Sequence, residues 1–329
     1  RVDRRQRQMC IRDRINMALY ELEQVNALVT EGYEINKAID FESNILGDMN
    51  ARSIKLRELL LLFQEIRLTN ATGQLIDVGD LYNQLLYIFA EEAGKKINNV
   101  LTPTEVVSLI TKLIDGDRKN ACLCDPASGS GTLLVEVGKK MGIRGTELYG
   151  QEVNWNLYAL TKMNLMLNGF KGATFLWGDS LSNPKLLDHG GLRKFDIVVS
   201  VPPFADKWAA EEAYSDFYKR FKYGIPPKSQ VTWAYISHIL ASLRNDGQAV
   251  VVVPVGVLFR NTESKIREQI IEHNLLEAVI ELPPNLFYGA AISTAILVFR
   301  KERMRTQTLF VDARKGLSLI HISEPTRPY

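Results

Sequence analysis

Three acidic residues follow short apolar runs at an even spacing, and their position suggests a ligand site. Asp125, Glu152 and Asp179 each end a predicted strand, and each lies 27 positions after the one before. Ligands of an open α/β sheet bind beyond the carboxyl ends of its strands. Three carboxylates on one rim would favour a positively charged ligand with hydroxyl and amino groups to bind.

The segment after Asp125, PASGSGTLLVEV, resembles a ligand-binding turn. Gly129 and Gly131 allow a tight turn and a close backbone approach before the next helix. The turn lacks the Lys of a P-loop, and Leu134 stands where a dinucleotide motif requires its third Gly. A nicotinamide dehydrogenase could still use Glu152 for a ribose, so the first two strands leave that function open.

The third acid narrows the choice of ligand. Asp179 in GDS suits an adenine amino group, and an acidic rim tolerates a cation better than a pyrophosphate. S-adenosylmethionine has both features. We expect Glu152 to bind its ribose, Asp179 its adenine, and Asp125 with the turn 129–132 its methionine part.

The elements that position these residues are predicted from apolar runs. Seven runs alternate with helical segments beyond residue 99, which indicates a mostly parallel, doubly wound sheet covered on both faces. They are ACLCDPA, TELYGQE, ATFLWGD, FDIVVSVPP, GQAVVVVPV, EAVIELP and TAILVFR. A further run, TLFVDAR, is expected as an edge strand. Residues 15–98 show helical periodicity, and Thr102 with Glu105 predicts a capping box at the start of the next helix.

The two ends of the chain differ from the rest. Residues 1–14 and 317–329 resemble translated sequencing-adapter sequence, so we expect a chain truncated at both ends and exclude them from the fold. Residues 1–14 carry six Arg and two Asp, and without both ends the formal charge changes from +2 to −2. Net charge therefore gives no case for nucleic-acid binding.

The remaining composition is that of an ordinary cytoplasmic protein. No uncharged apolar run approaches the roughly 20 residues of a membrane span, and 46% of residues are hydrophobic. Cys122 and Cys124 are two apart in one strand, which predicts buried thiols on one face rather than a metal or redox site. No metal is expected.

Several segments together resemble the modification (methyltransferase) subunit of type I restriction-modification systems. They are LTPTEVV, DPASGSGTLL, YGQEVN, GDSL, VPPF, RFKYGIPPKS, VVVVPVGVLFR and LPPNLFYGAAISTAILVFRK, in order over most of residues 50–313. The resemblance implies a class I S-adenosylmethionine-dependent methyltransferase domain at 99–316 after a helical N-terminal domain at 15–98. It also implies N6-methylation of adenine in double-stranded DNA, a specificity subunit, a restriction subunit and a second copy of the chain.

The resemblance assigns roles to particular residues. The expected cofactor-binding residues are Leu101, Thr102, Pro103, Thr104, Asp125, Ser128, Gly129, Ser130, Gly131, Thr132, Glu152, Asp179 and Ser180. The expected catalytic residues are Val201, Pro202, Pro203 and Phe204. The expected contacts with the extruded base are Phe204 and Phe287. Segment 205–230 mixes basic and aromatic residues beside the corner, a composition that suits a nucleic-acid backbone and stacking, so Lys207, Trp208 and Arg220 are expected to contact DNA.

Val201 departs from the family pattern. Enzymes of this class extrude the adenine and stack it on an aromatic side chain, here Phe204. The family has Asn or Asp before Pro-Pro, whose oxygen accepts a hydrogen bond from the adenine amine, and valine cannot accept one. Ser200 lies one residue earlier and should face the other way. The Pro202 carbonyl remains as an acceptor.

Several functions therefore stay open. The first is DNA adenine methylation, and the second is a catalytically weak or inactive subunit that binds S-adenosylmethionine and DNA, because of Val201. A protein-glutamine or RNA methyltransferase could share an Asn-Pro-Pro-aromatic corner, although VLFR and NLFYG argue against it. A dehydrogenase is the most distant alternative.

Overall fold

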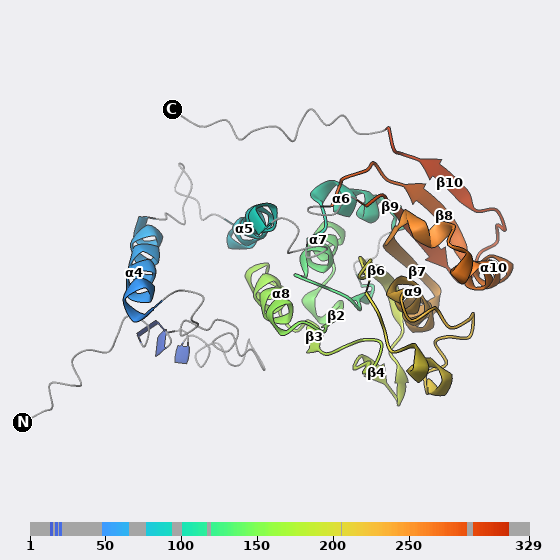
Figure 1. Cartoon of the computed structure of the whole chain (residues 1–329), viewed down its shortest axis with the longest axis horizontal. Coiled ribbons are helices and arrows are strands. Elements are labelled where there is room, and N and C mark those ends of the chain that lie inside the picture. The colour runs from blue at the N-terminus through green and yellow to red at the C-terminus, as the bar shows by residue number, and fades with distance from the viewer. Residues whose placement is uncertain are drawn as a thin grey trace, which may run out of the picture.

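The computed structural model describes residues 14–15, 17–18, 20–21, 48–65, 77–93, 101–116, 120–204, 206–287 and 292–315. Nearly all of the two predicted adapter segments lies outside these residues, so their interpretation stays a prediction. Within the predicted N-terminal helical region the structure contains α4 (Met49–Glu65) and α5 (Val78–Ala93). Helix α5 packs beside α8 (Trp155–Leu167), while α4 lies apart from the sheet (Figure 1).

An eight-stranded sheet forms the centre of the protein, and every predicted apolar run is one of its strands. Its order is β10-β8-β9-β7-β6-β1-β2-β3. The strands are β1 (Leu123–Asp125), β2 (Leu148–Glu152), β3 (Thr174–Trp177), β6 (Phe195–Ser200), β7 (Leu243–Pro254), β8 (Leu276–Glu281), β9 (Thr294–Arg300) and β10 (Leu309–Asp312). A small hairpin, β4 (Leu187–Asp188) with β5 (Gly191–Leu192), was not predicted.

The strand directions confirm a mostly parallel sheet. Within the eight-stranded sheet, as far as the structure describes it, β9 alone runs antiparallel to both of its neighbours, β7 and β8. Strand β10 pairs with β8 alone, which confirms the predicted edge strand. Strand β1 lies between β2 and β6. The strands that follow β1 in the chain are placed first on one side of it, as β2 and β3, and then on its other side, as β6 and β7. Ligands of open α/β sheets bind beside the strand at which this change of side occurs.

Helices cover both faces of the sheet (Figure 1). On one face α6 (Thr104–Leu113), α7 (Thr132–Met141) and α8 pack on the sheet, and on the other lie α9 (Val231–Ser242) and α10 (Ser264–Glu272). Both faces are covered because the strands carry apolar side chains on both sides. In β7, Val250 and Val252 belong to the core under α6, α7 and α8, while Ala249, Val251 and Val253 belong to the core under α9 and α10. Short 3-10 helices are η4 (Gly145–Glu147), η5 (Ala210–Ser215), η6 (Val255–Leu258) and η7 (Asn261–Glu263).

The predicted capping box at α6 is wrong. The helix begins at Thr104 with Pro103 as its N-cap residue, and no side chain caps it. Pro103 has extended backbone angles, which place Thr102 outside the first turn, where its carbonyl accepts a bond from the Tyr87 hydroxyl at 2.9 Å.

Two further findings concern the cysteines and the possibility of a membrane span. Cys122 and Cys124 are buried free thiols, as predicted. Among the described residues, no helix has the length and apolar character needed to cross a membrane.

Candidate functional site

The three predicted acids lie at the carboxyl ends of the three strands β1, β2 and β3. Asp125 and Glu152 are the last residues of β1 and β2 and are 1% and 7% exposed. Asp179 follows β3 by two residues and accepts hydrogen bonds from the Leu181 amide at 2.8 Å and the Ser182 hydroxyl at 2.9 Å. No ion pair engages these acids within the described part of the chain. No neighbouring cation of the described residues therefore neutralises these carboxyl groups.

Glu152 holds the glycine turn in place. Its Oε2 accepts a bond from the Gly129 amide at 2.8 Å, and its Oε1 accepts one from the Asn154 amide at 2.8 Å. From α8, the Thr161 hydroxyl donates to the Gly129 carbonyl at 2.8 Å. Burial raises the pKa of Glu152, and the amide bonds oppose that rise. The turn after β1 is thus fixed by the acid at the end of β2.

The turn leaves no room for a side chain at Gly131. This residue has φ +74°, and a Cβ atom there would lie 2.3 Å from Cγ2 of Thr161. We expect Gly131→Ala to lower the free energy of unfolding by more than the roughly 1–2 kcal/mol that a left-handed backbone alone costs a non-glycine residue.

The control for this prediction is Gly116→Ala, which has φ +76° but no atom within 4 Å of the added Cβ. Urea unfolding of both variants separates the steric contact from the backbone strain. Equal losses of stability would show that Thr161 does not constrain the turn.

Hydrogen bonds join the glycine turn to the neighbouring strand ends. The Ser200 hydroxyl on β6 donates to Oδ1 of Asp125 at 2.9 Å, and the Ser180 hydroxyl donates to the Pro126 carbonyl at 2.6 Å. Ser200 is therefore directed at Asp125, in agreement with the expectation that it does not replace the missing acceptor at position 201. These bonds connect the end of β6 and the loops after β1 and β3 along one edge of the sheet.

Asp125 is an unusually weak acid in this setting. Burial raises the pKa of Asp125 to about 7; the bonds from the Ala127 amide and the Ser200 hydroxyl oppose this rise, and the Glu152 charge adds to it. The folded chain therefore holds this proton at a higher pH than the unfolded chain, whose aspartate titrates near 3.9.

This difference predicts a pH dependence of stability. Between about pH 4.5 and 6.5 the folded state binds more protons, so the free energy of unfolding should fall with rising pH, by at most about 1.4 kcal/mol per unit for this group. Asp125→Asn should reduce that slope, as measured by urea unfolding across the pH series. Equal slopes in both proteins would contradict an elevated pKa at Asp125.

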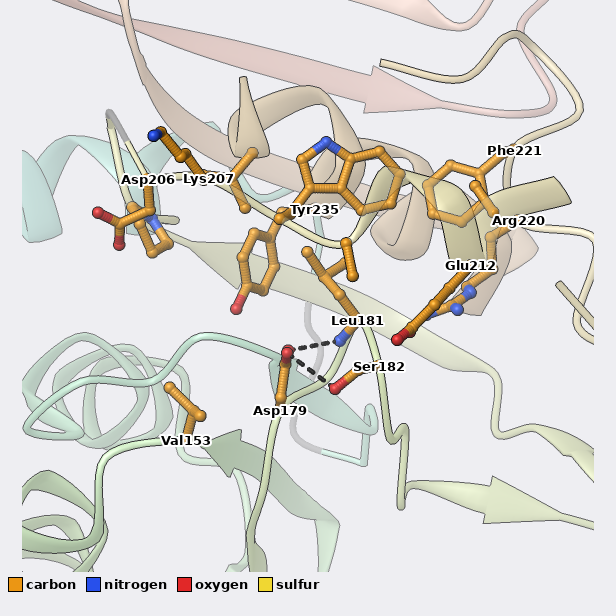
Figure 2. A pocket seen from close by; sticks show the side chains of 15 residues that line it. Val153, Asp179, Leu181, Ser182, Asp206, Lys207, Glu212, Arg220, Phe221 and Tyr235 are labelled. Atoms are coloured by element: carbon orange, nitrogen blue, oxygen red, sulfur yellow. Dashed lines mark hydrogen bonds between the residues drawn. The ribbon is translucent and has the colours of Figure 1, made fainter. Parts of the chain in front are cut away.

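A pocket of about 150 Å³ lies between Asp179, the third acid of the rim, and Pro203 of the Pro-Pro corner, whereas Asp125 and Glu152 are not among the residues that line it (Figure 2). Asp179 and Ser182 lie on one side of it, and Pro203 comes from the corner. The rest of the lining is Val153, Leu181, Asp206, Lys207, Trp208, Ala209, Glu212, Ala213, Arg220, Phe221, Val231 and Tyr235. Residues from the ends of β2, β3 and β6 thus share one cavity.

Tyr235 on α9 lies in this pocket, and our sequence interpretation missed it. It is 6% exposed, and in Figure 2 its hydroxyl is directed toward the side where Asp179 lies. Burial raises the pKa of Tyr235, and the charges of four acids add to the rise: Asp179, Glu152, Asp125 and Asp206. The phenol hydroxyl within the apolar run WAYI was the available signal.

The corner itself is apolar and closely packed. Val201 and Phe204 are buried, and the Phe204 ring meets Phe287 edge-to-face with centroids 5.6 Å apart. The two aromatic residues predicted to hold the extruded base are thus brought together, from the loop after β6 and from the loop after β8. The Pro203 carbonyl accepts a bond from the Thr232 hydroxyl at 3.2 Å.

The segment 206–230 covers the pocket. Trp208 stacks on Phe221 at 5.1 Å and donates to the Pro227 carbonyl at 3.0 Å. Arg220 is buried, pairs with Asp216 at 2.8 Å and donates to the Ser180 carbonyl at 3.1 Å. A phosphate contact by Arg220 would have to break this pair, whereas Lys207 is exposed.

The other predicted cofactor-binding residues lie in two groups. Leu101 and Thr102 are buried, and Leu101 packs on Leu86 of α5, next to the start of α6. Ser130 and Thr132 share a hydroxyl contact at 2.9 Å in the glycine turn. Nothing in the structure tests a contact of these residues with a cofactor.

The residues present fit S-adenosylmethionine. Among the residues that the structure describes, the Ser128 hydroxyl is buried and has no hydrogen-bond partner, so the turn has a polar atom to offer a ligand. Gly129 and Gly131, with φ +58° and +74°, leave the turn without side chains at two positions. The acids of the rim can accept from hydroxyl and amino groups and favour a cationic sulfonium.

Comparison with known proteins identifies the family of this chain. Residues 75–324 match the family described as N-6 DNA Methylase. The chain is 33% identical over 286 residues to the type I restriction enzyme MpnII methylase subunit of Mycoplasma pneumoniae, covering 82% of this chain and 52% of that protein.

Solved structures give the same result. The type I restriction-modification system methyltransferase subunit from Streptococcus thermophilus matches with a TM-score of 0.78 and 27% identity, covering 94% of this chain and 68% of that one. A Listeria monocytogenes protein described as a class I S-adenosylmethionine-dependent methyltransferase shares the fold, with a TM-score of 0.63, 19% identity, and 92% and 94% coverage. The fold is thus the class I methyltransferase fold. The chain spans about half the length of the curated relatives it matches, 52% and 48% for two of them.

Proposed function

This chain belongs to the N-6 DNA methylase family, and we propose that it transfers a methyl group from S-adenosylmethionine to N6 of adenine in DNA, as the methylase subunit of a type I restriction-modification system. The observation that carries the proposal is the shared pocket, in which the acid that follows β3 and the Pro-Pro corner that follows β6 line one cavity. A cofactor at the rim would thereby lie next to a base at the corner.

The cofactor's parts are assigned from the geometry of the rim. Glu152 is the acceptor for the ribose hydroxyls, and Asp179 is the acceptor for the adenine amine between Leu181, Pro203 and Tyr235. Asp125 and the turn 128–132 hold the methionine part, with Leu101, Thr102, Pro103, Thr104 and Ser180 around them. When bound, the cofactor supplies an activated methyl group on a sulfonium.

The corner receives the extruded adenine. Phe204 offers its face for stacking, with Phe287 as the second wall, once the edge-to-face contact between them opens. The Pro202 carbonyl accepts one N–H of the amine, and Lys207 provides an exposed charge for a DNA phosphate. Trp208 and Arg220 support the covering segment through buried contacts.

The partners are proposed from the relatives. Proteins similar to this chain are named methylase subunits of type I restriction enzymes. We assign to this chain a specificity subunit, a restriction subunit, a second copy of itself and duplex DNA as partners. Residues 15–98 would form the helical N-terminal domain and residues 99–316 the methyltransferase domain.

The test combines the chain with the specificity subunit encoded beside it. S-adenosylmethionine affinity is measured by calorimetry, and N6-methyladenine is measured by mass spectrometry after incubation with duplex DNA. We expect binding and transfer. Val201 favours one rival, a subunit that binds cofactor and DNA without catalysis, and binding without transfer would support that rival.

A further inference from the structure

The side chain of Val201 has no atom that can accept a hydrogen bond from the target adenine. If the proposed function is right, another residue near the corner must supply this acceptor. The lone pair of the adenine amine is delocalised into the ring, so the amine is a poor nucleophile. An acceptor for one of its N–H groups favours tetrahedral geometry at the nitrogen, and in that geometry the lone pair can attack the methyl group. The Ser200 hydroxyl donates to Asp125, and the Thr232 hydroxyl donates to the Pro203 carbonyl, and both side chains are fully buried. Neither hydroxyl is directed into the open part of the site.

Asp206 has the properties of the missing acceptor. It lies five residues after Val201, is exposed, and lines the same pocket as Pro203. In Figure 2 Asp206 lies to the left of Tyr235, beside Lys207, and Asp179 lies below Tyr235. Its effect on the pKa of Tyr235 agrees with a charge close to the cavity.

The backbone of Asp206 is held while its side chain is available. Its carbonyl accepts a bond from the Val231 amide at 3.3 Å, at the start of α9. Across the part of the chain that the structure describes, no hydrogen bond or ion pair occupies its carboxylate. Asp179 differs in this respect, since its carboxylate is engaged by the Leu181 amide and the Ser182 hydroxyl.

We propose that Asp206 replaces the missing side-chain acceptor of the Val-Pro-Pro-Phe corner and receives an amine N–H of the target adenine. The inference rests on the proposed function. In the transfer the N6 lone pair forms the new N–C bond, the S–C bond breaks, and its electron pair stays on sulfur as a neutral thioether. The extra N6 proton is then lost to water.

The test uses the full chain with its specificity subunit and compares Asp206→Ala, Asp206→Asn, Val201→Asn and the double variant Val201→Asn with Asp206→Ala. Loss of one preorganised polar partner costs about 10²–10³ in rate, so Asp206→Ala should lose that much transfer with unchanged S-adenosylmethionine affinity. Asp206→Asn, which keeps a carbonyl oxygen, should lose less. Val201→Asn should restore most of the rate of Asp206→Ala, because either oxygen then suffices.

Glu211→Ala is the matched control, an exposed acid of the same segment that pairs with Lys228 and does not line the pocket. It should leave transfer unchanged. Full activity in Asp206→Ala, or no rescue by Val201→Asn, would overturn the role of Asp206. Activity that appears only with Val201→Asn would also overturn it while the proposed function stands. Cofactor and DNA binding without transfer by any variant would overturn both.

Discussion

Glu152→Ala is expected to weaken S-adenosylmethionine binding by about 10²–10⁴-fold. Each hydrogen bond to a charged group contributes about 1.5–3 kcal/mol, and the carboxylate would accept two from the ribose hydroxyls. The same oxygens hold the amides of Gly129 and Asn154, each at 2.8 Å, so the variant also leaves the glycine turn without its support. Calorimetric titration of the cofactor measures the effect.

Glu147→Ala separates this effect from a general loss of charge or stability. Glu147 directly precedes β2, at the opposite end from Glu152, where it accepts a bond from the Cys122 thiol at 3.1 Å and pairs with Arg144 at 3.5 Å. We expect its cofactor affinity to match that of the native chain. A Glu152→Ala protein that folds and binds the cofactor with native affinity would remove Glu152 from the site.

Much of the fold was predictable because buried parallel strands carry their own signal. Val250 to Val253 are apolar at every position, which is typical of a strand packed on both faces, and β7 packs that way. The ends of such strands share one edge, so Asp125 and Glu152 could be placed at a common rim from their spacing alone. The antiparallel direction of β9 was not predictable, since it depends on which distant strands β9 pairs with.

The covering segment shows why side-chain roles were harder to predict. Arg220 and Trp208 lie among Lys and aromatic residues, a composition typical of a nucleic-acid surface, yet both are buried. Their burial depends on Asp216, Pro227 and Phe221, partners that only the folded chain brings near. Tyr235 was missed for a related reason, because an apolar helix does not reveal which of its faces borders a cavity.

Phe204→Leu is expected to lower methyl transfer by about 10–100-fold, since stacking of a base on an aromatic side chain contributes about 1–3 kcal/mol. Leucine keeps an apolar side chain against Phe287 but has no flat face for the adenine. S-adenosylmethionine affinity should stay unchanged. Transfer is measured at saturating cofactor, and 2-aminopurine fluorescence at the target position reports whether the base is still extruded.

Phe299→Leu provides the control for the loss of core packing, because Phe299 is fully buried on β9 in the core on the α9 side of the sheet. Both substitutions should lower the free energy of unfolding, since each removes buried volume. Only Phe204→Leu should lower transfer and the fluorescence signal. If the two variants lost transfer equally, the contribution of Phe204 would be packing of the corner against Phe287, and the extruded base would need another platform.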